Sequence, residues 1–213
     1  SKIPNRYGGS YMEIKYRGAE AIVETRQWLG QKVIFKTRNK RGYRHPTLEK
    51  RLVKERLRSE ARILERLISY GVKVPAIYSV DTFKNCIIME FIEGITLEKA
   101  LRGDNFNQYL DETAKLLALL HSLNIVHGDP TTSNFMVTDV VYAIDFGLSS
   151  VSDDSEDRAS DLRVFLESLD SHHSEISGRE IFLSHYSEWS DSGPVLEALK
   201  VLELRGRYNL MRG

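Results

Sequence analysis

Two polar motifs in the second half of the chain limit its fold and chemistry more than any other feature. The first, 127–134, reads H-G-D-P-T-T-S-N and contains the spacing Asp-x-x-x-x-Asn, and the second is Asp145-Phe146-Gly147. Alone, an aspartate before proline is commonly a turn residue, and a tripeptide is a weak signal. Their occurrence together, between a long apolar helix pattern and a short strand pair, indicates one catalytic segment.

The residue types in these motifs suit the transfer of a phosphoryl group. That reaction needs a carboxylate that orients the attacking oxygen, and oxygen ligands for a magnesium ion on the phosphates. Asp129 supplies the first, and Asn134 and Asp145 supply the second in the required order. The sequence therefore predicts an enzyme that uses ATP and Mg²⁺, with Asp129 as the catalytic residue.

The first 92 residues have the pattern of a small antiparallel sheet with one helix. Residues 1–10 are polar and contain Pro4 and Gly8-Gly9, as expected for a leader or linker. Apolar residues recur at helical spacing over 48–70. Alternating patterns predict strands at 11–17, 21–25, 32–37, 76–81 and 85–91, with a turn at 18–20 between the first two.

From residue 93 onward the pattern is mainly helical. It predicts helices at 106–123, 156–170, 177–190 and 194–206, and short strands at 135–137 and 142–144. We predict an α+β, two-lobed, protein-kinase-like fold. A small antiparallel sheet lobe with one helix (11–92) joins a reduced, mainly helical lobe (93–213) through a hinge at 91–96. Gly206 is expected to end the last helix and leave a basic C-terminal tail, 205–212.

A lysine that binds the nucleotide phosphates, and a helix carboxylate that holds it, are expected in the sheet lobe. Lys36 follows Val33-Ile34-Phe35 and matches the V-A-I-K pattern of kinases. Helical phase places Glu55 opposite the apolar stripe, and Glu60 and Glu65 on its two flanks. We choose Glu60 as the partner of Lys36, with Glu65 as the alternative.

Three further residues are candidates for nucleotide contacts. Gly18 lies in the first expected turn, where backbone amides would face phosphates, although the segment has one glycine and is no G-x-G-x-x-G loop. Glu90 and Ile92 lie beside the expected hinge.

Composition narrows the class of protein. The chain has 213 residues and 41% hydrophobic content, enough for one sizeable core or two small lobes. The single cysteine, Cys86, cannot form an internal disulfide, and no apolar run approaches the ~20 residues of a membrane helix. We therefore expect a cytoplasmic protein. His121 is expected to be a satisfied core histidine, and the pair His172-His173, in a polar stretch, to be exposed.

Six segments of the sequence carry a resemblance to a known family; they are residues 18–21, 43–46, 58–62, 71–75, 89–94 and 127–134. Together they resemble one family, the small atypical kinase and ATPase of the KEOPS complex in its archaeal form. The resemblance runs from about Gly18 to Arg207, and the Y-R-H-P and H-G-D-x-T-T-S-N motifs are specific to it. Pro130 departs from the family, which usually has leucine there; proline fixes φ and removes an amide donor beside Asp129.

The resemblance implies a two-lobed kinase-like fold, and ATP hydrolysis or autophosphorylation on serine or threonine. It also implies support of tRNA threonylcarbamoyladenosine (t6A) synthesis. The implied direct partner is the threonylcarbamoyl-transferase subunit, with the other KEOPS subunits and with tRNA reached through the complex. Some archaea fuse kinase and transferase in one polypeptide, and residues 1–10 are compatible with such a linker. The basic tail is expected to act in the complex and not in folding.

Two features of conventional protein kinases are missing. Gly128 occupies the position of the arginine that pairs with a phosphorylated activation loop. Only 13 residues lie between Gly147 and Asp161, and they contain no Ala-Pro-Glu motif for a peptide platform. ATP hydrolysis on behalf of partners therefore fits better than general protein phosphorylation.

Three other functions fit part of the sequence. They are a RIO-type kinase, an aminoglycoside-phosphotransferase-like small kinase, and a non-catalytic kinase-like scaffold that binds tRNA through the basic stretch 32–58. The 66 residues after Gly147 leave little room for the substrate helices of the second. The third would normally lose a metal ligand or the catalytic aspartate, and this chain keeps them.

Overall fold

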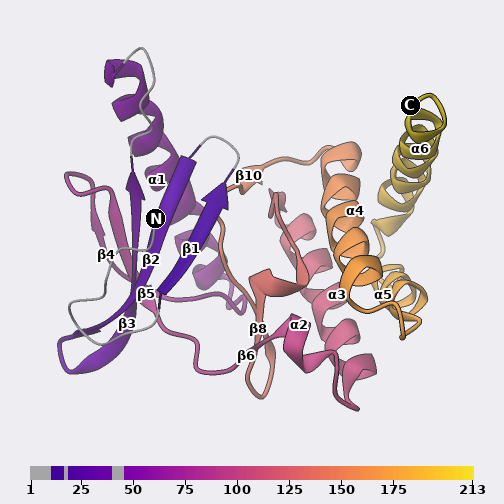
Figure 1. Ribbon diagram of the computed structural model, residues 1–213, viewed down its shortest axis with the longest axis horizontal. Helices are drawn as coiled ribbons and strands as arrows, with labels where there is room; N and C mark the ends of the chain where they lie inside the picture. Colours follow the sequence, from indigo (N-terminus) through magenta and orange to yellow (C-terminus); the bar gives the residue numbers. More distant parts are fainter. Residues whose placement is uncertain (1–10, 17–18, 40–45) are drawn as a thin grey trace. The chain divides into compact units, whose positions relative to one another are not determined.

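The chain folds into two units, one built on a β-sheet and one built mainly of helices (Figure 1). The first unit ends at Ile92 and the second begins at Glu93. The computed structural model describes residues 11–16, 19–39 and 46–213. The predicted α+β, kinase-like fold class is confirmed by this architecture.

The sheet unit is an antiparallel sheet with one long helix. Its strands lie in the order β1-β2-β3-β5-β4, and every neighbouring pair runs antiparallel. In chain order the elements are β1 (Tyr11–Tyr16), β2 (Ala19–Trp28), β3 (Gln31–Asn39), α1 (Pro46–Ser69), β4 (Ile77–Asp81) and β5 (Cys86–Glu90).

The register of β2 and β3 is set by a two-residue turn. Leu29 and Gly30 both have positive φ, 49° and 79°, which is the backbone that a tight hairpin turn requires. The turn pairs Trp28 with Gln31 and continues the ladder toward the end of β3. Because side chains alternate along a strand, Lys36 and Arg38 lie on the same face of the sheet.

Helix α1 packs against the sheet and touches β3, β4 and β5 (Figure 1). Its buried stripe has the i, i+4, i+8, i+11 spacing of one helix face, formed by Val53, Leu57, Ala61 and Leu64. Glu60 precedes Ala61 and is buried with the stripe. The helix therefore brings one acidic side chain into the core of the sheet unit.

The helical unit combines six helical segments, one of them 3₁₀, with short strands. Strands β6, β8 and β9 form one small sheet, and β7 pairs with β10. In chain order the elements are β6 (Ile95–Thr96), α2 (Leu97–Ala100), α3 (Phe106–Ser122), β7 (Ile125–Val126), η1 (Thr132–Asn134), β8 (Phe135–Val137), β9 (Val141–Ala143), β10 (Ser150–Val151), α4 (Ser155–His172), α5 (Gly178–Tyr186) and α6 (Ser192–Met211).

The core of this unit lies between its helices. Helix α3 packs on α5, and α4 packs on α6. Phe165 of α4 lies 4.4 Å from Phe182 of α5 and 5.8 Å from Phe135 of β8, measured between ring centroids. These fully buried rings fix α4 against the segment that carries the polar motifs.

Several predicted element boundaries differ from those in the structure. Ala19 and Glu20 were expected in a turn but belong to β2 and pair with β1; Gly18 lies outside the described residues. The helix expected at 177–190 ends at Tyr186. Helix α6 does not end at Gly206 but continues to Met211. A glycine inside a helix costs only about 1 kcal/mol, so the helical residues around it outweigh that cost.

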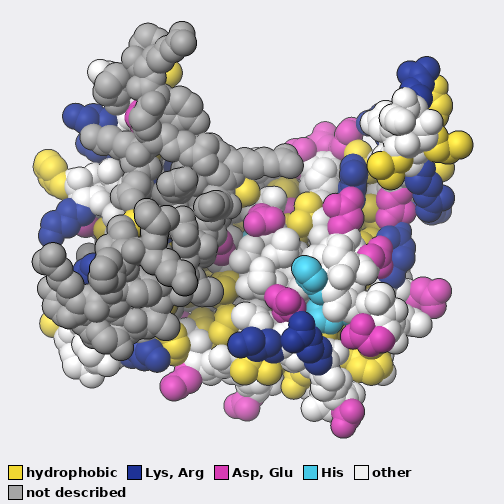
Figure 2. Space-filling view, viewed as in Figure 1, with side chains coloured by type: hydrophobic (Ala, Val, Ile, Leu, Met, Phe, Trp, Pro, Cys, Tyr) yellow, Lys and Arg dark blue, Asp and Glu magenta, His cyan; other side chains and the backbone are white. Residues whose placement is uncertain are grey.

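The C-terminal part of α6 therefore forms a helix with an exposed apolar surface. Leu204, Tyr208 and Met211 are 62%, 57% and 87% exposed. Figure 2 shows hydrophobic side chains beside Lys and Arg side chains over the C-terminal part of α6. Among the described residues, no helix is long and apolar enough to cross a membrane.

Candidate active site

The loop that carries the first polar motif is fixed by one buried carboxylate on α4. Asp161 Oδ2 accepts a hydrogen bond from the backbone N of His127 at 2.8 Å, and Oδ1 accepts one from Gly128 N at 2.9 Å. Asp161 is only 1% exposed. Hydrogen bonds to a charged group contribute about 1.5–3 kcal/mol each. The two residues before Asp129 are thus held through their backbone.

Asp161 is in turn held by the buried side chain of His121, which is itself held by the buried Tyr186. His121 Nε2 lies 2.9 Å from Asp161 Oδ2, and His121 Nδ1 lies 2.8 Å from the hydroxyl of Tyr186. Because a carboxylate oxygen accepts, Nε2 donates to Asp161, and Nδ1 accepts from Tyr186. The prediction of a satisfied core histidine at His121 is confirmed. The sequence did not reveal the roles of Asp161 and Tyr186, because their partners are 33 to 65 residues away.

Asn134 orients Asp129. Its Nδ2 donates to the backbone O of Asp129 at 2.8 Å and to Asp129 Oδ2 at 3.3 Å. The backbone N of Thr131 also donates to Asp129 O, at 2.8 Å. The donors that close the loop therefore belong to Thr131 and Asn134. The amide that Pro130 lacks is not needed for this closure. Since Nδ2 of Asn134 is used within the loop, the amide oxygen is its remaining ligand atom.

A backbone hydrogen bond joins the residue before Asp145 to Asn134. The N of Ile144 donates to Asn134 O at 3.0 Å, one step beyond the β8–β9 pairing. Asp145 has a φ of 62°, and its Oδ1 accepts from Gly147 N at 3.3 Å. Burial raises the pKa of Asp145 to about 7. A cation beside this carboxylate would favour its ionised form.

The donor set of this loop fits Mg²⁺. Asn134 contributes an amide oxygen and Asp145 a carboxylate, and Mg²⁺ prefers hard oxygen ligands of these kinds. Asn134 and Asp145 are therefore the residues that would hold the ion.

The structure also explains why residue 128 is a glycine. Gly128 has a φ of 91°, and a Cβ added there would lie 2.2 Å from the backbone O of Leu148. The chain directly after Asp145-Phe146-Gly147 therefore packs on the backbone of residue 128. A side chain such as arginine has no room there unless one of the two segments moves.

The sheet unit contributes a separate cluster of buried charges. Lys36 Nζ donates to Glu60 Oε1 at 2.5 Å, and Arg38 Nη2 donates to Glu60 Oε2 at 2.8 Å. These three residues are 3%, 2% and 2% exposed. Of the competing acids, Glu55 pairs with Arg51 on the exposed side of α1, and Glu65 is exposed. The chosen residue, Glu60, is thus the carboxylate that binds Lys36, and the alternative, Glu65, is not; Arg38 was not anticipated.

Burial and charge act in opposite directions in this cluster. Burial lowers the pKa of Lys36, and Glu60 opposes this effect. Burial would raise the pKa of Glu60, but Lys36 and Arg38 outweigh it and hold the pKa of this carboxyl below its usual value. Glu60 is therefore ionised at neutral pH.

The remaining candidate residues of the sheet unit have other local partners or none described. Glu90 ends β5, and its Oε1 accepts from Ala76 N at 3.1 Å, which ties β5 to the chain before β4. Ile92 is buried, 8% exposed. Gly18 lies outside the described residues. Nucleotide contacts by these three residues stay predictions.

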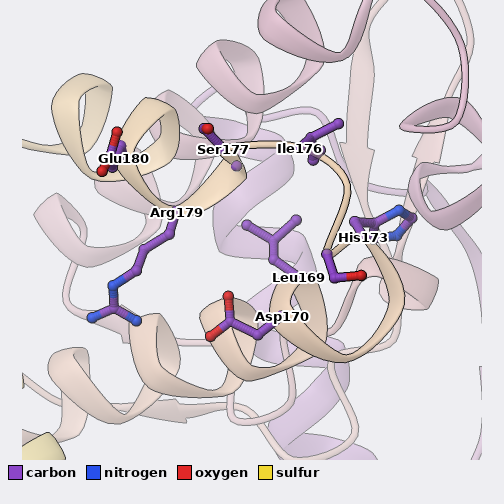
Figure 3. A pocket seen from close by; sticks show the side chains of 9 residues that line it. Leu169, Asp170, His173, Ile176, Ser177, Arg179 and Glu180 are labelled. Atoms are coloured by element: carbon purple, nitrogen blue, oxygen red, sulfur yellow. The ribbon is translucent and has the colours of Figure 1, made fainter.

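A pocket in the helical unit contains none of the predicted site residues. It lies between the C-terminal end of α4 and the N-terminal end of α5, and its labelled residues include Leu169, Asp170, Ile176 and Arg179 (Figure 3). Arg179 forms an ion pair with Glu203. The pocket is therefore not the predicted nucleotide site.

The expected exposure of His173, at the edge of this pocket, is wrong. His173 is 1% exposed, and its ring points away from the other labelled side chains (Figure 3). Its backbone N donates to Leu169 O at 2.8 Å and its O accepts from Ile176 N, so the chain turns back and covers the ring. The polar sequence around it gave no signal of this turn.

The fold and these clusters define a class of protein. Residues 26–164 match the RIO domain family, so the chain belongs to this class of kinase-like proteins. Two relatives narrow the assignment. The KEOPS complex subunit Bud32 of Pyrococcus abyssi is 40% identical over 186 residues, which cover 83% of this chain and 84% of that protein. A probable bifunctional tRNA threonylcarbamoyladenosine biosynthesis protein of Methanospirillum hungatei is 39% identical over 196 residues, 90% of this chain and 36% of that protein.

The chain therefore belongs to the Bud32 family of KEOPS subunits, as its motifs predicted. It spans about a third of the length of the bifunctional relative and most of the length of the single-domain one.

Two solved structures share the fold at low sequence identity. The Rio2 kinase–ADP/Mg²⁺–phosphoaspartate complex of Chaetomium thermophilum has a TM-score of 0.60 and 12% identity, and the match covers 95% of this chain and 72% of that one. The aminoglycoside-3'-phosphotransferase of type VIII has a TM-score of 0.64 and 16% identity, with 92% and 93% covered. These likenesses confirm the kinase-like fold.

Proposed function

We propose that the protein is an atypical serine/threonine kinase and ATPase that uses Mg²⁺-ATP and supports t6A modification of tRNA in the KEOPS complex. The observation that carries this proposal is the loop in which Asp161 fixes the backbone before Asp129 and Asn134 orients its side chain. The names of the relatives support the role in t6A synthesis. The Rio2 structure with ADP and Mg²⁺ supports the choice of cofactors.

In the proposed reaction, a water or a serine or threonine hydroxyl attacks the γ-phosphorus of ATP. The bond from that phosphorus to the β–γ bridging oxygen breaks, ADP leaves, and the proton of the nucleophile passes to the Asp129 carboxylate. Asn134 keeps this carboxylate oriented through its Nδ2. Mg²⁺, when bound, neutralises charge on the phosphates, and Asn134 and Asp145 would hold it.

The sheet unit binds the same nucleotide in this proposal. Lys36 neutralises the α- and β-phosphates, and Glu60 holds its ammonium group in place. Gly18, Glu90 and Ile92 provide further nucleotide contacts.

Hydrolysis on behalf of partner subunits fits the helical unit better than phosphorylation of many proteins. The close packing of Gly128 on Leu148 leaves no space for the arginine that reads a phosphorylated loop. The proposed partners are the threonylcarbamoyl-transferase subunit and the other KEOPS subunits, with tRNA bound through the complex. The basic end of α6 and a cytoplasmic location belong to the same proposal.

The experiment that tests this function removes a proposed magnesium ligand. Asp145→Ala should lower Mg²⁺-dependent ATP turnover at least about a hundredfold, because the charge on the phosphates is no longer neutralised in place. Asp139→Ala, an exposed aspartate in the β8–β9 turn, is the matched control and should keep the wild-type rate.

Unchanged turnover in Asp145→Ala would exclude the kinase-type mechanism. If the wild-type protein binds its partners and tRNA but turns over no ATP with them, the non-catalytic scaffold is the correct function. Rapid transfer to an aminoglycoside in place of partner-dependent hydrolysis would favour the small-molecule kinase.

A further inference from the structure

Glu60 holds two cations, one on each carboxylate oxygen. Lys36 Nζ is 2.5 Å from Oε1 and Arg38 Nη2 is 2.8 Å from Oε2. Both cations come from the same face of β3, whereas the carboxylate comes from α1. A Lys-Glu pair needs only one of these cations, so the second has a role that the pair does not explain.

Several cationic side chains lie near the Glu60 carboxylate. One buried carboxylate faces two buried cations, and Arg56, one helical turn before Glu60, adds positive charge near Arg38. The neighbours of Lys36 across the sheet, Val23 and Ile87, are apolar. Removing a charge from water costs several kcal/mol unless a partner compensates it. Glu60 compensates Lys36 and Arg38 at the same time, so the position of its carboxylate affects both cations.

We propose that Arg38 is a positioning residue for nucleotide binding, which acts on Lys36 through the carboxylate that the two cations share. This inference rests on the proposed function, in which Lys36 binds the phosphates of ATP. Arg38 holds Oε2 of Glu60 and prevents the carboxylate from rotating. It also draws part of the negative charge away from Lys36, so that the ammonium group keeps its attraction for phosphate.

The effect of Arg38 on Lys36 has a measurable sign. Burial lowers the pKa of Lys36, Glu60 raises it, and Arg38 lowers it further. Only protonated Lys36 binds phosphate well, so kcat/KM for ATP falls as pH rises through this pKa in the free enzyme. Without Arg38 the pKa of Lys36 rises, and the alkaline limb of the profile moves to higher pH.

The experiment measures ATP turnover as a function of pH and ATP concentration in two variants. Arg38→Met removes the charge and the hydrogen bond, and Arg38→Gln removes the charge but keeps a donor for Glu60. We expect KM for ATP to rise about tenfold in Arg38→Met at neutral pH, with kcat within about threefold, because a charged hydrogen bond of this size is lost. The alkaline limb of kcat/KM should move upward in both variants.

Two controls separate positioning from packing. Arg51→Met removes an exposed cation from α1, the helix that carries Glu60. It should leave KM for ATP and the alkaline limb of kcat/KM unchanged. In a Glu60→Gln background, Arg38→Met should change KM by less than about twofold, because its route to Lys36 has been removed. Thermal midpoints of all variants show how much of the loss is a loss of fold.

A wild-type KM and an unmoved limb in both Arg38 variants would overturn the inference, whatever their thermal midpoints. If Arg38→Met does not fold, an unmoved limb in Arg38→Gln is sufficient to overturn it. An equal effect of Arg38→Met with and without Glu60 would show that Arg38 acts directly and not through the carboxylate. Failure of the proposed function looks different, because the wild-type protein itself would then show no Mg²⁺-dependent turnover.

Discussion

The two units bury charge in opposite ways. In the sheet unit, the carboxylate of Glu60 binds two cationic side chains, Lys36 and Arg38. In the helical unit, the carboxylate of Asp161 accepts hydrogen bonds from two backbone amides and from the ring of His121. The first arrangement fixes two cationic side chains, and the second fixes a loop.

Under the proposed function, this difference gives each unit a different role. Backbone amides have no rotamers, so the loop that Asp161 binds keeps its geometry when substrates bind and dissociate. Long cationic side chains can move, and a shared carboxylate restricts them without removing their charge. We infer that the sheet unit binds the phosphates of the nucleotide and that the helical unit orients the carboxylate of Asp129.

The largest effect is expected when the anchor of the helical unit is weakened. Asp161→Asn replaces an oxygen that accepts by an amide that donates, opposite two backbone donors in a buried site. We expect a stability loss of about 3–5 kcal/mol and an ATP turnover at least about a hundredfold lower. Chemical denaturation and steady-state kinetics measure the two effects. Asp170→Asn, an exposed residue of the same helix, is the control. A wild-type rate in Asp161→Asn would mean that the loop does not depend on this anchor.

A smaller effect is expected at Tyr186, which is linked to Asp161 through His121. Burial raises the pKa of Tyr186, so its hydroxyl is a neutral donor to His121 at any ordinary pH. Tyr186→Phe removes that donor and should cost about 1–2 kcal/mol of stability, with turnover within about threefold of wild type. Thermal unfolding beside Tyr208→Phe, an exposed tyrosine on α6, measures the difference. A loss of turnover as large as that of Asp161→Asn would show that Tyr186 takes part in orienting the loop.

Local patterns made much of this architecture predictable. Each of the two polar motifs, 127–134 and 145–147, is one unbroken stretch of sequence. Their predicted chemistry and their place beside a helix and a strand pair therefore follow from short segments. Helical phase along α1 excluded Glu55, because phase is a property of one helix, but it left both Glu60 and Glu65 as candidates. The order of strands and helices predicted only an α+β class, and the polar motifs predicted the kinase-like fold.

Features that depend on distant contacts were not predictable in this way. Alternation places Arg38 on the face of Lys36, but only the packing of α1 shows that both cations meet one carboxylate. Asp161 lies in a polar helix pattern that resembles a solvated surface. His173 was expected outside and is buried, because a turn after α4 closes over it. The length of α6 was underestimated, because the helix tolerates Gly206.

The central claim, that the loop held by Asp161 makes Asp129 a catalytic carboxylate, is tested most directly by separating binding from chemistry in Asp129→Asn. Nucleotide affinity from equilibrium titration and the rate of a single turnover should be measured in the same protein. The account predicts an affinity within about threefold of wild type and a rate lower by about a hundredfold to ten-thousandfold, because a base that orients the nucleophile contributes little to ground-state binding. A parallel loss of affinity and rate, or a rate that does not change, would contradict it and leave Asp129 as a structural residue of the loop.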